Sequence, residues 1–119
     1  MEPGAAAPPT AMRSVTVLGS TGSIGTQALD VIRDNRDQFE VFAVAALGAT
    51  EQSQHTLAKQ IAEFSPRVCA VTDPAAVPAI RALLPAGAVP PDFLTGENAL
   101  TELADHRVDV LLNALAGAA

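Results

Sequence analysis

The sequence has little of what several classes of protein depend on. Its 119 residues include one cysteine, Cys69, so neither an internal disulfide nor a cluster of cysteine metal ligands can form. Seven residues are Lys or Arg against thirteen Asp or Glu, and the formal net charge of −6 leaves no basic face for nucleic acid. The apolar runs are all shorter than the ~20 residues that cross a bilayer. We therefore expect a soluble, cytoplasmic protein that binds neither nucleic acid nor membrane.

Aromatic residues are also scarce, with four Phe and no Tyr or Trp. Without tyrosine, the chain lacks the Tyr-x-x-x-Lys proton donor of short-chain dehydrogenases. The acidic residues are scattered over expected helix faces and helix starts, and no pair forms an evident metal site. His55 and His106 lie in polar surroundings, which favours solvated side chains. The sequence therefore assigns no catalytic residue and no metal ligand.

The chain has the length of one ordinary domain, too short for a nucleotide domain plus a separate substrate domain. Residues 1–13 contain Pro and Gly, and their apolar residues do not recur at the regular spacing of a helix or strand. We interpret them as a flexible leader. Residues 14–119 are then expected to form a dinucleotide-binding domain, or the amino-terminal portion of one.

Strand and helix patterns alternate along this domain. Apolar runs predict strands over 14–18, 40–47, 67–71, 92–94 and 108–115, and helical spacing predicts helices over 24–35, 50–64, 73–84 and 96–106. In the first helix the buried face is expected to carry Ile24, Ala28, Val31 and Ile32. The last strand is expected to be buried, as in parallel sheets covered on both sides. This order indicates the α/β class: a Rossmann-like parallel sheet with helices on both faces, in incomplete form.

Three glycines separate the first strand from the first helix in VTVLGSTGSIGTQALDVI, residues 15–32. Gly19 lets the chain reverse, Gly22 has no Cβ and lets the backbone approach a pyrophosphate, and Gly25 lets the helix pack closely. The loop has no Lys, so it is not a Walker-type phosphate loop. It follows a strand at the carboxyl edge of the sheet, where open α/β folds bind ligands. This context predicts dinucleotide binding, with a purely structural turn as the alternative.

The backbone N–H groups at the start of the first helix provide the expected phosphate contacts, and the helix dipole favours an anion there. These groups belong to Thr21, Gly22, Ser23 and Ile24. The hydroxyls of Ser20, Thr21 and Ser23 are expected to add hydrogen bonds to phosphate oxygens.

The end of the second strand bears on the choice of cofactor. An NAD site usually has Asp or Glu there, bonded to the ribose 2′-hydroxyl, whereas this chain has Ala45, Ala46 and Leu47. Glu51 is the counter-argument, and we interpret it as a first-turn carboxylate behind Thr50 as helix cap. The missing acid favours NADP over NAD, although no Arg or Lys lies nearby in the sequence to hold a 2′-phosphate.

Four segments resemble the amino-terminal part of 1-deoxy-D-xylulose 5-phosphate reductoisomerase: VTVLGSTGSIGTQALDVIRDN, QFEVFAVAAL, EFSPRVCAVTD and VDVLLNALAGAA. The core LGSTGSIGT is highly specific to that family, and the resemblance runs from about Val15 to the last residue. The Ala-rich composition is similar to that of members from high-GC bacteria such as actinobacteria. Leu47 stands where the family typically has glycine, and Gly48 and Ala49 stand where many members place Lys and Asn.

The resemblance implies NADPH as cofactor. The residues implied to contact it are Thr21, Gly22, Ser23 and Ile24 in the glycine loop, together with Gly48 and Ala49 in the turn after the second strand. Family members continue well beyond the matching part with the acidic ligands of a divalent metal and a helical domain. We therefore expect residues 14–119 to hold no metal and to be inactive alone.

For the intact enzyme, the resemblance implies that Mg²⁺ or Mn²⁺ chelates a sugar phosphate substrate, 1-deoxy-D-xylulose 5-phosphate, and promotes its rearrangement. NADPH then supplies hydride to give 2-C-methyl-D-erythritol 4-phosphate for non-mevalonate isoprenoid synthesis. A homodimer is also implied.

Other functions stay open at this point. The chain could be a non-catalytic NADP-binding or sensing module, or the cofactor domain of another α/β dehydrogenase, such as a semialdehyde dehydrogenase-like enzyme. It could also be a folding fragment without useful affinity, because an incomplete sheet leaves its last strand exposed at an edge.

Overall fold

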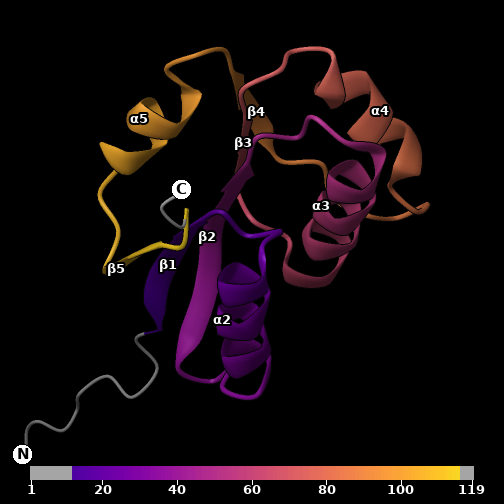
Figure 1. Cartoon of the computed structure of the whole chain (residues 1–119). Helices are drawn as coiled ribbons and strands as arrows, with labels where there is room; N and C mark the ends of the chain where they lie inside the picture. The colour runs from indigo at the N-terminus through magenta and orange to yellow at the C-terminus, as the bar shows by residue number, and fades with distance from the viewer. Residues whose placement is uncertain (1–11, 116–119) are drawn as a thin grey trace, which may run out of the picture.

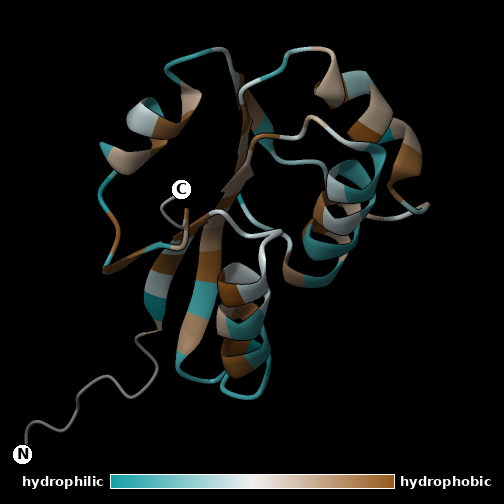
Figure 2. Cartoon of the chain, in the orientation of Figure 1, coloured by the Kyte–Doolittle hydropathy of each residue, from teal (hydrophilic) through white to brown (hydrophobic). Residues whose placement is uncertain are grey.

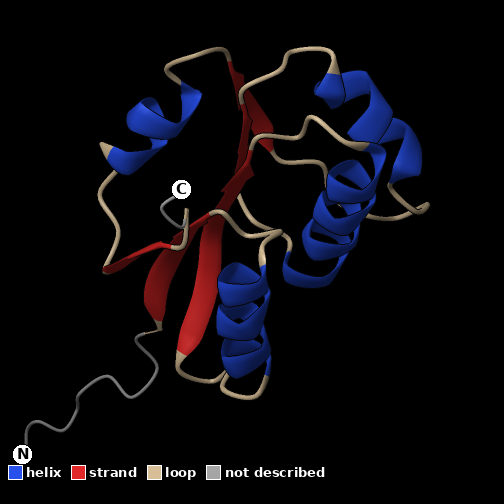
Figure 3. Ribbon diagram, in the orientation of Figure 1, coloured by secondary structure: helices blue, strands red, loops and turns tan. Residues whose placement is uncertain are grey.

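The computed structural model describes residues 12–115 and contains one five-stranded sheet (Figures 1 and 3). Its strands are β1 (Arg13–Leu18), β2 (Phe39–Ala46), β3 (Val68–Val71), β4 (Asp92–Thr95) and β5 (Val110–Asn113). They lie in the order β4-β3-β2-β1-β5, and every neighbouring pair is parallel. The predicted Rossmann-like α/β class is confirmed. The leader predicted for 1–13 lies outside the described residues except for Met12 and Arg13, and Arg13 already pairs with Phe39.

Four helices connect the strands: α2 (Ser23–Arg33), α3 (Glu51–Phe64), α4 (Ala76–Leu83) and α5 (Ala99–Ala104). The chain moves from β1 to β4 in one direction across the sheet, and then returns past β1 to form β5. Because parallel crossovers are right-handed, the first three connections place their helices on one face and the return places α5 on the other. Figure 1 shows this arrangement, with α5 apart from the other three helices.

Each face of the sheet has its own apolar core. Figure 2 shows that the helices carry both hydrophobic and hydrophilic residues, whereas the central strands are mostly hydrophobic. On one face Leu29, Leu57, Ile61 and Ile80 from the first three helices pack on Val15, Val17, Val44, Cys69 and Val71. On the other face Ala99 and Leu103 of α5 pack on Leu18, Ala43, Ala45, Val68 and Ala70. The strand residues alternate between the two cores, as the two-residue period of a strand requires.

The buried face of α2 differs from the expected one. Gly25, Leu29 and Ile32 are buried, whereas Ile24 is 59% exposed and Val31 is 58% exposed. The helix carries two adjacent apolar stripes, and its close approach to the loop through Gly25 selects the stripe that continues through Leu29 and Ile32. The expectation that Ile24 and Val31 face the core is therefore wrong.

The last strand also differs from expectation. Leu111 is 45% exposed and Leu112 is 36% exposed, although the apolar run predicted a buried strand. β5 lies at the edge of the sheet beside β1, so only one side of its backbone is paired within residues 12–115. No helix among these described residues is long and apolar enough to cross a membrane.

Candidate functional site

A hollow of about 290 Å³ lies where β1, β2 and β5 end. Its walls come from the loop after β1, the turn between β2 and α3, and the residues that follow β5. They are Gly19, Thr21, Gly22, Ala46, Leu47, Gly48, Ala49, Thr50, Ser53, Ala114 and Leu115. Because all strands are parallel, these segments meet at one edge of the sheet, the edge at which open α/β folds bind ligands.

Gly19 forms the sharp reversal on one side of the hollow. Its φ of +83° lies in the left-handed region that favours glycine. The N–H groups of Gly19 and Ser20 both donate to the carbonyl oxygen of Ala45, at 2.8 and 2.9 Å. A Cβ on Gly19 would also lie 2.7 Å from the carbonyl oxygen of Ala114. The neighbouring strands thus fix the loop and leave no room for a side chain at this position.

Gly22 and Gly25 have different surroundings. A Cβ on Gly25 would lie 2.1 Å from the carbonyl oxygen of Gly19, so α2 packs against the loop only because residue 25 is glycine. A Cβ on Gly22 would have one neighbour within 4 Å, the carbonyl oxygen of Gly19 at an ordinary 3.7 Å. Since Gly22 also has an extended backbone that other residues adopt, nothing within the described chain requires glycine there. A ligand that approaches the backbone closely would require it.

The start of α2 offers backbone donors beside this space. Ser23 and Ile24 are its first two residues, and N–H groups in a first helical turn have no acceptor within the helix. Gly22 differs from expectation, because its N–H donates to Gly19 across 3.3 Å. Ser20 is fully buried, so the expectation that its hydroxyl contacts phosphate is wrong. Thr21 and Ser23 remain accessible.

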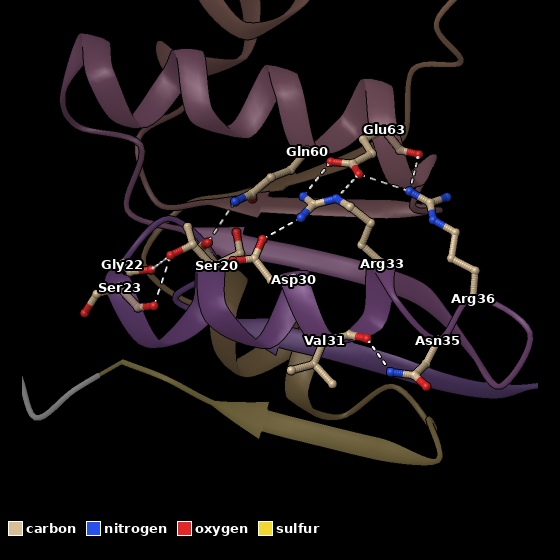
Figure 4. Close-up of polar contacts among 11 residues, drawn as sticks. Ser20, Gly22, Ser23, Asp30, Val31, Arg33, Asn35, Arg36, Gln60 and Glu63 are labelled. Carbon is tan, nitrogen blue, oxygen red and sulfur yellow. Dashed lines mark hydrogen bonds and ion pairs between the residues drawn. The ribbon is translucent and has the colours of Figure 1, made fainter.

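A buried glutamine supports the loop from behind. The side-chain amide of Gln60 on α3 donates to the carbonyl oxygen of Ser20 at 2.8 Å, and Gln60 itself is 7% exposed (Figure 4). This contact ties α3 to the glycine loop across 40 residues of sequence. Sequence reasoning missed Gln60, although a polar residue between Leu57 and Ile61 on a buried helix face is a recognisable signal.

Several side-chain hydrogen bonds hold the turn between β2 and α3, including one from the Thr72 hydroxyl to the Leu47 carbonyl at 3.2 Å. Thr50 caps α3, because its hydroxyl oxygen accepts from the N–H of Ser53 at 3.1 Å, which agrees with the interpretation of Thr50 from the sequence. The Gln54 amide donates to the Gly48 carbonyl at 3.0 Å. The hydroxyls of Ser53 and Thr21 lie 3.5 Å apart, so the two loops meet across the hollow.

Five of the eight predicted cofactor-binding residues line the hollow: Gly19, Thr21, Gly22, Gly48 and Ala49. The other three do not, since Gly25 is buried behind the loop and Ser23 and Ile24 lie on the exposed start of α2. Leu47 also lines the hollow, in the turn that the resemblance implies contacts the cofactor. Thr50, Ser53 and the residues after β5 were not predicted as wall residues. Their place depends on which strands become neighbours, which the sequence does not state directly.

The side chains around the hollow carry no charge, and the strongest charge cluster lies elsewhere. At the far end of α2, Arg33 binds both Asp30 and Glu63, and Arg36 contacts Glu63 at 3.2 Å (Figure 4). The hydrogen bond from Arg33 holds the pKa of the Glu63 carboxyl below its ordinary value, against partial desolvation. This cluster joins α2 to α3 on the surface and has a structural role.

Two further groups bear on the chemistry. Burial raises the pKa of the Cys69 thiol to about 12, so the thiol is not a nucleophile in the folded chain. Within residues 12–115, no three His, Cys, Asp or Glu side chains gather where they could hold a metal ion. The carboxamide of Asn113 accepts a hydrogen bond from the N–H of Leu115 at 3.1 Å and so shapes the wall after β5. The groups that the described residues offer to a ligand at the hollow are therefore backbone groups and the hydroxyls of Thr21, Thr50 and Ser53.

Comparison with known proteins gives consistent results. The family profile of 1-deoxy-D-xylulose 5-phosphate reductoisomerase matches residues 15–119. The enzyme of that name from Cutibacterium acnes is 50% identical over 115 residues, which cover 91% of this chain and 28% of the relative.

Solved structures agree. The Zymomonas mobilis reductoisomerase in complex with NADPH aligns at 32% identity with a TM-score of 0.72, covering 85% of this chain and 25% of that one. A DOX-P reductoisomerase in complex with NADPH, fosmidomycin and magnesium aligns at 26% identity with a TM-score of 0.66, covering 84% and 24%. The chain thus spans about a quarter of the length of the relatives it matches.

Proposed function

Because the chain belongs to the 1-deoxy-D-xylulose 5-phosphate reductoisomerase family, we propose that the hollow at the carboxyl edge of its sheet binds NADPH. The observation that carries this proposal is the environment of Gly22. The position tolerates a Cβ as far as the described chain is concerned, yet it faces the hollow beside the free N–H groups that begin α2. A pyrophosphate in contact with the backbone at Gly22 accounts for both features.

Different residues in and beside the hollow contact different parts of the cofactor. Backbone donors at Ser23 and Ile24 and the hydroxyl of Thr21 receive the phosphates, while Gly19 and Gly25 hold the loop in its shape. Gly48 and Ala49 contact the adenosine end of the cofactor in the turn after β2. When bound, NADPH supplies a hydride, and this chain fixes where the nicotinamide lies and shields one side of it.

For the whole protein we propose the activity for which the family is named. It is reductive rearrangement of 1-deoxy-D-xylulose 5-phosphate to 2-C-methyl-D-erythritol 4-phosphate by a cytoplasmic homodimer, with Mg²⁺ or Mn²⁺ held by residues outside this chain. A solved relative contains both NADPH and magnesium, and residues 12–115 contain no group of metal ligands. Cofactor binding is the contribution that we propose for this chain.

The test is a calorimetric titration of the chain with NADPH, compared between wild type and Gly22→Val. We expect the valine side chain to occupy the space of the pyrophosphate and to weaken binding by at least about a hundredfold, with the far-UV circular dichroism unchanged. Ala82→Val is the matched control, because Ala82 is exposed on α4 and outside the hollow. Unchanged affinity in a folded Gly22→Val variant would refute the phosphate-loop assignment.

A further inference from the structure

We propose that Gln60 is a positioning residue for cofactor binding. Its side-chain amide holds the peptide between Ser20 and Thr21 in the orientation that leaves the N–H of Thr21 available to the phosphates. The inference rests on the proposed function and names the group on α3 that prepares the glycine loop for an anion. Gln60 is not among the residues that line the hollow, so it acts through the backbone of the loop and not by contact with the cofactor.

The contact between Gln60 and the loop fixes the direction of one peptide. The amide of Gln60 donates to the carbonyl oxygen of Ser20 at 2.8 Å, and both residues are buried (Figure 4). Within residues 12–115, no backbone group donates to this oxygen. A trans peptide is planar, and its C=O and N–H groups point in opposite directions. Because the carbonyl of Ser20 points to Gln60 on α3, the N–H of Thr21 points away from Gln60.

The N–H of Thr21 is available to a ligand. It donates to no backbone acceptor in the described part of the chain, whereas the N–H groups of Gly19, Ser20 and Gly22 each donate to a backbone carbonyl. Thr21 is also one of the residues that line the hollow. If its peptide rotated by half a turn, a carbonyl oxygen would take the place of this donor and would repel a phosphate. The direction of this peptide therefore changes the affinity of the loop for an anion.

The same peptide is the one that rotates most readily in a turn of this kind. The N–H of Gly22 donates to the carbonyl of Gly19 at 3.3 Å and closes a β-turn, in which Ser20–Thr21 is the central peptide. Turn types I and II differ by a half-turn of the central peptide. The rotated form gives Thr21 a positive φ, which is costly for a β-branched residue, and Thr21 has no positive φ here. Gln60 adds a hydrogen bond to this local preference.

The other end of the amide argues against a purely structural role. The Oε1 atom of Gln60 is buried, and it has no hydrogen-bond partner within the described chain. Gln60 lies among the buried residues of α3, with Leu57 and Ile61. Burial of an unpaired amide oxygen costs free energy that an apolar side chain of similar length would avoid. The fold thus accepts an unpaired oxygen in order to place a donor against the carbonyl of Ser20.

The experiment is a calorimetric titration with NADP⁺, which carries the same pyrophosphate as NADPH, of wild type, Gln60→Met and Gln60→Glu. The titrations run from about pH 5.5 to about pH 8, because burial raises the pKa of a carboxyl into this range. Methionine has no donor, and we expect it to weaken binding by about fivefold or more at every pH. Ionised glutamate accepts from the N–H of Thr21 in the rotated peptide, so Gln60→Glu should bind at least about tenfold more weakly than wild type at the upper pH. The protonated acid donates as the amide does, and its affinity should approach that of wild type at the lower pH.

Gln38→Glu is the matched control, because Gln38 is exposed and directly precedes β2, at the edge of the sheet opposite to the hollow. It should bind NADP⁺ as wild type does at each pH. Wild-type affinity of Gln60→Met would overturn the proposal, since the negative charge alone would then explain any loss in Gln60→Glu. Far-UV circular dichroism checks that each variant is folded, and Gln60→Met decides the proposal by itself if Gln60→Glu does not fold.

The outcomes separate this inference from the proposed function. If Gly22→Val abolished binding while the folded Gln60 variants bound NADP⁺ as wild type does at every pH, only the role of Gln60 would be refuted. If the folded wild-type chain bound no NADP⁺, the proposed function would fail and this inference with it.

Discussion

Gly25→Ala tests whether the loop and α2 meet as closely as the structure shows. Intrinsic propensity alone makes alanine better than glycine inside a helix by about 0.8–1 kcal/mol, so a position without tertiary contacts would be stabilised. Here the new Cβ would lie 2.1 Å from the carbonyl oxygen of Gly19 and 2.7 Å from the Cα of Ser20. Both are backbone atoms of a loop held by β2 and Gln60, so neither can move aside cheaply. We expect the sign to reverse, with a net loss of about 3 kcal/mol or more, at the upper end of overpacking costs.

Urea unfolding followed by far-UV circular dichroism measures this loss, since the chain has no Trp or Tyr for fluorescence. With an m-value of about 1–3 kcal/mol/M, the midpoint should fall by at least about 1 M. Gly22→Ala is the matched control, because its Cβ meets one atom at 3.7 Å, and it should cost no more than about 1 kcal/mol as a changed helix cap. A Gly25→Ala midpoint equal to or above that of Gly22→Ala would show that the close approach is wrong.

Three further predictions concern other parts of the fold. Thr50→Ala should lower the free energy of unfolding by about 1 kcal/mol, since the N–H of Ser53 loses its side-chain acceptor, and a Thr50→Ser variant should recover most of it in the same urea assay. The pKa of the Glu63 carboxyl is lowered in the folded state, so this carboxylate stabilises the fold above its unfolded-state pKa, and the stabilisation is lost as the pH falls through the folded-state pKa. The free energy of unfolding of wild type should therefore exceed that of Glu63→Gln near neutral pH, and the difference should vanish on acidification. A difference that grew on acidification would contradict the Arg33 contact. The buried Cys69 thiol, with its pKa raised to about 12, should react with a disulfide reagent only after unfolding, and rapid labelling of the native chain would contradict its burial.

The parts of the fold that the sequence predicted are those set by local chemistry. The glycine loop, the cap at Thr50 and the apolar runs of β2 and β3 each act through neighbours in the chain, so their positions follow from pattern. The class of fold follows from the alternation of strands and helices and the right-handed crossover rule.

The remaining features depend on which distant segments meet. The apolar run of β5 does not indicate that its neighbour is β1 or that it lies at an edge, so the exposure of Leu111 and Leu112 was not predictable. The two apolar stripes of α2 are equivalent by sequence, and packing through Gly25 decides between them. Gln60 supports a loop 40 residues away, and its partner is a backbone carbonyl that any residue could provide.

The position of β5 beside β1 has a consequence for how the protein is made. Synthesis proceeds from the amino end, so Gly19 and Thr21 leave the ribosome early, while Ala114 and Leu115, which complete the wall beside Gly19, leave almost a hundred residues later. A nascent chain therefore has no finished hollow until its last described strand has emerged and crossed the sheet. A dinucleotide that binds there cannot guide the early steps of folding. It binds only the completed fold and, by mass action, shifts the equilibrium between folded and unfolded molecules toward the folded state.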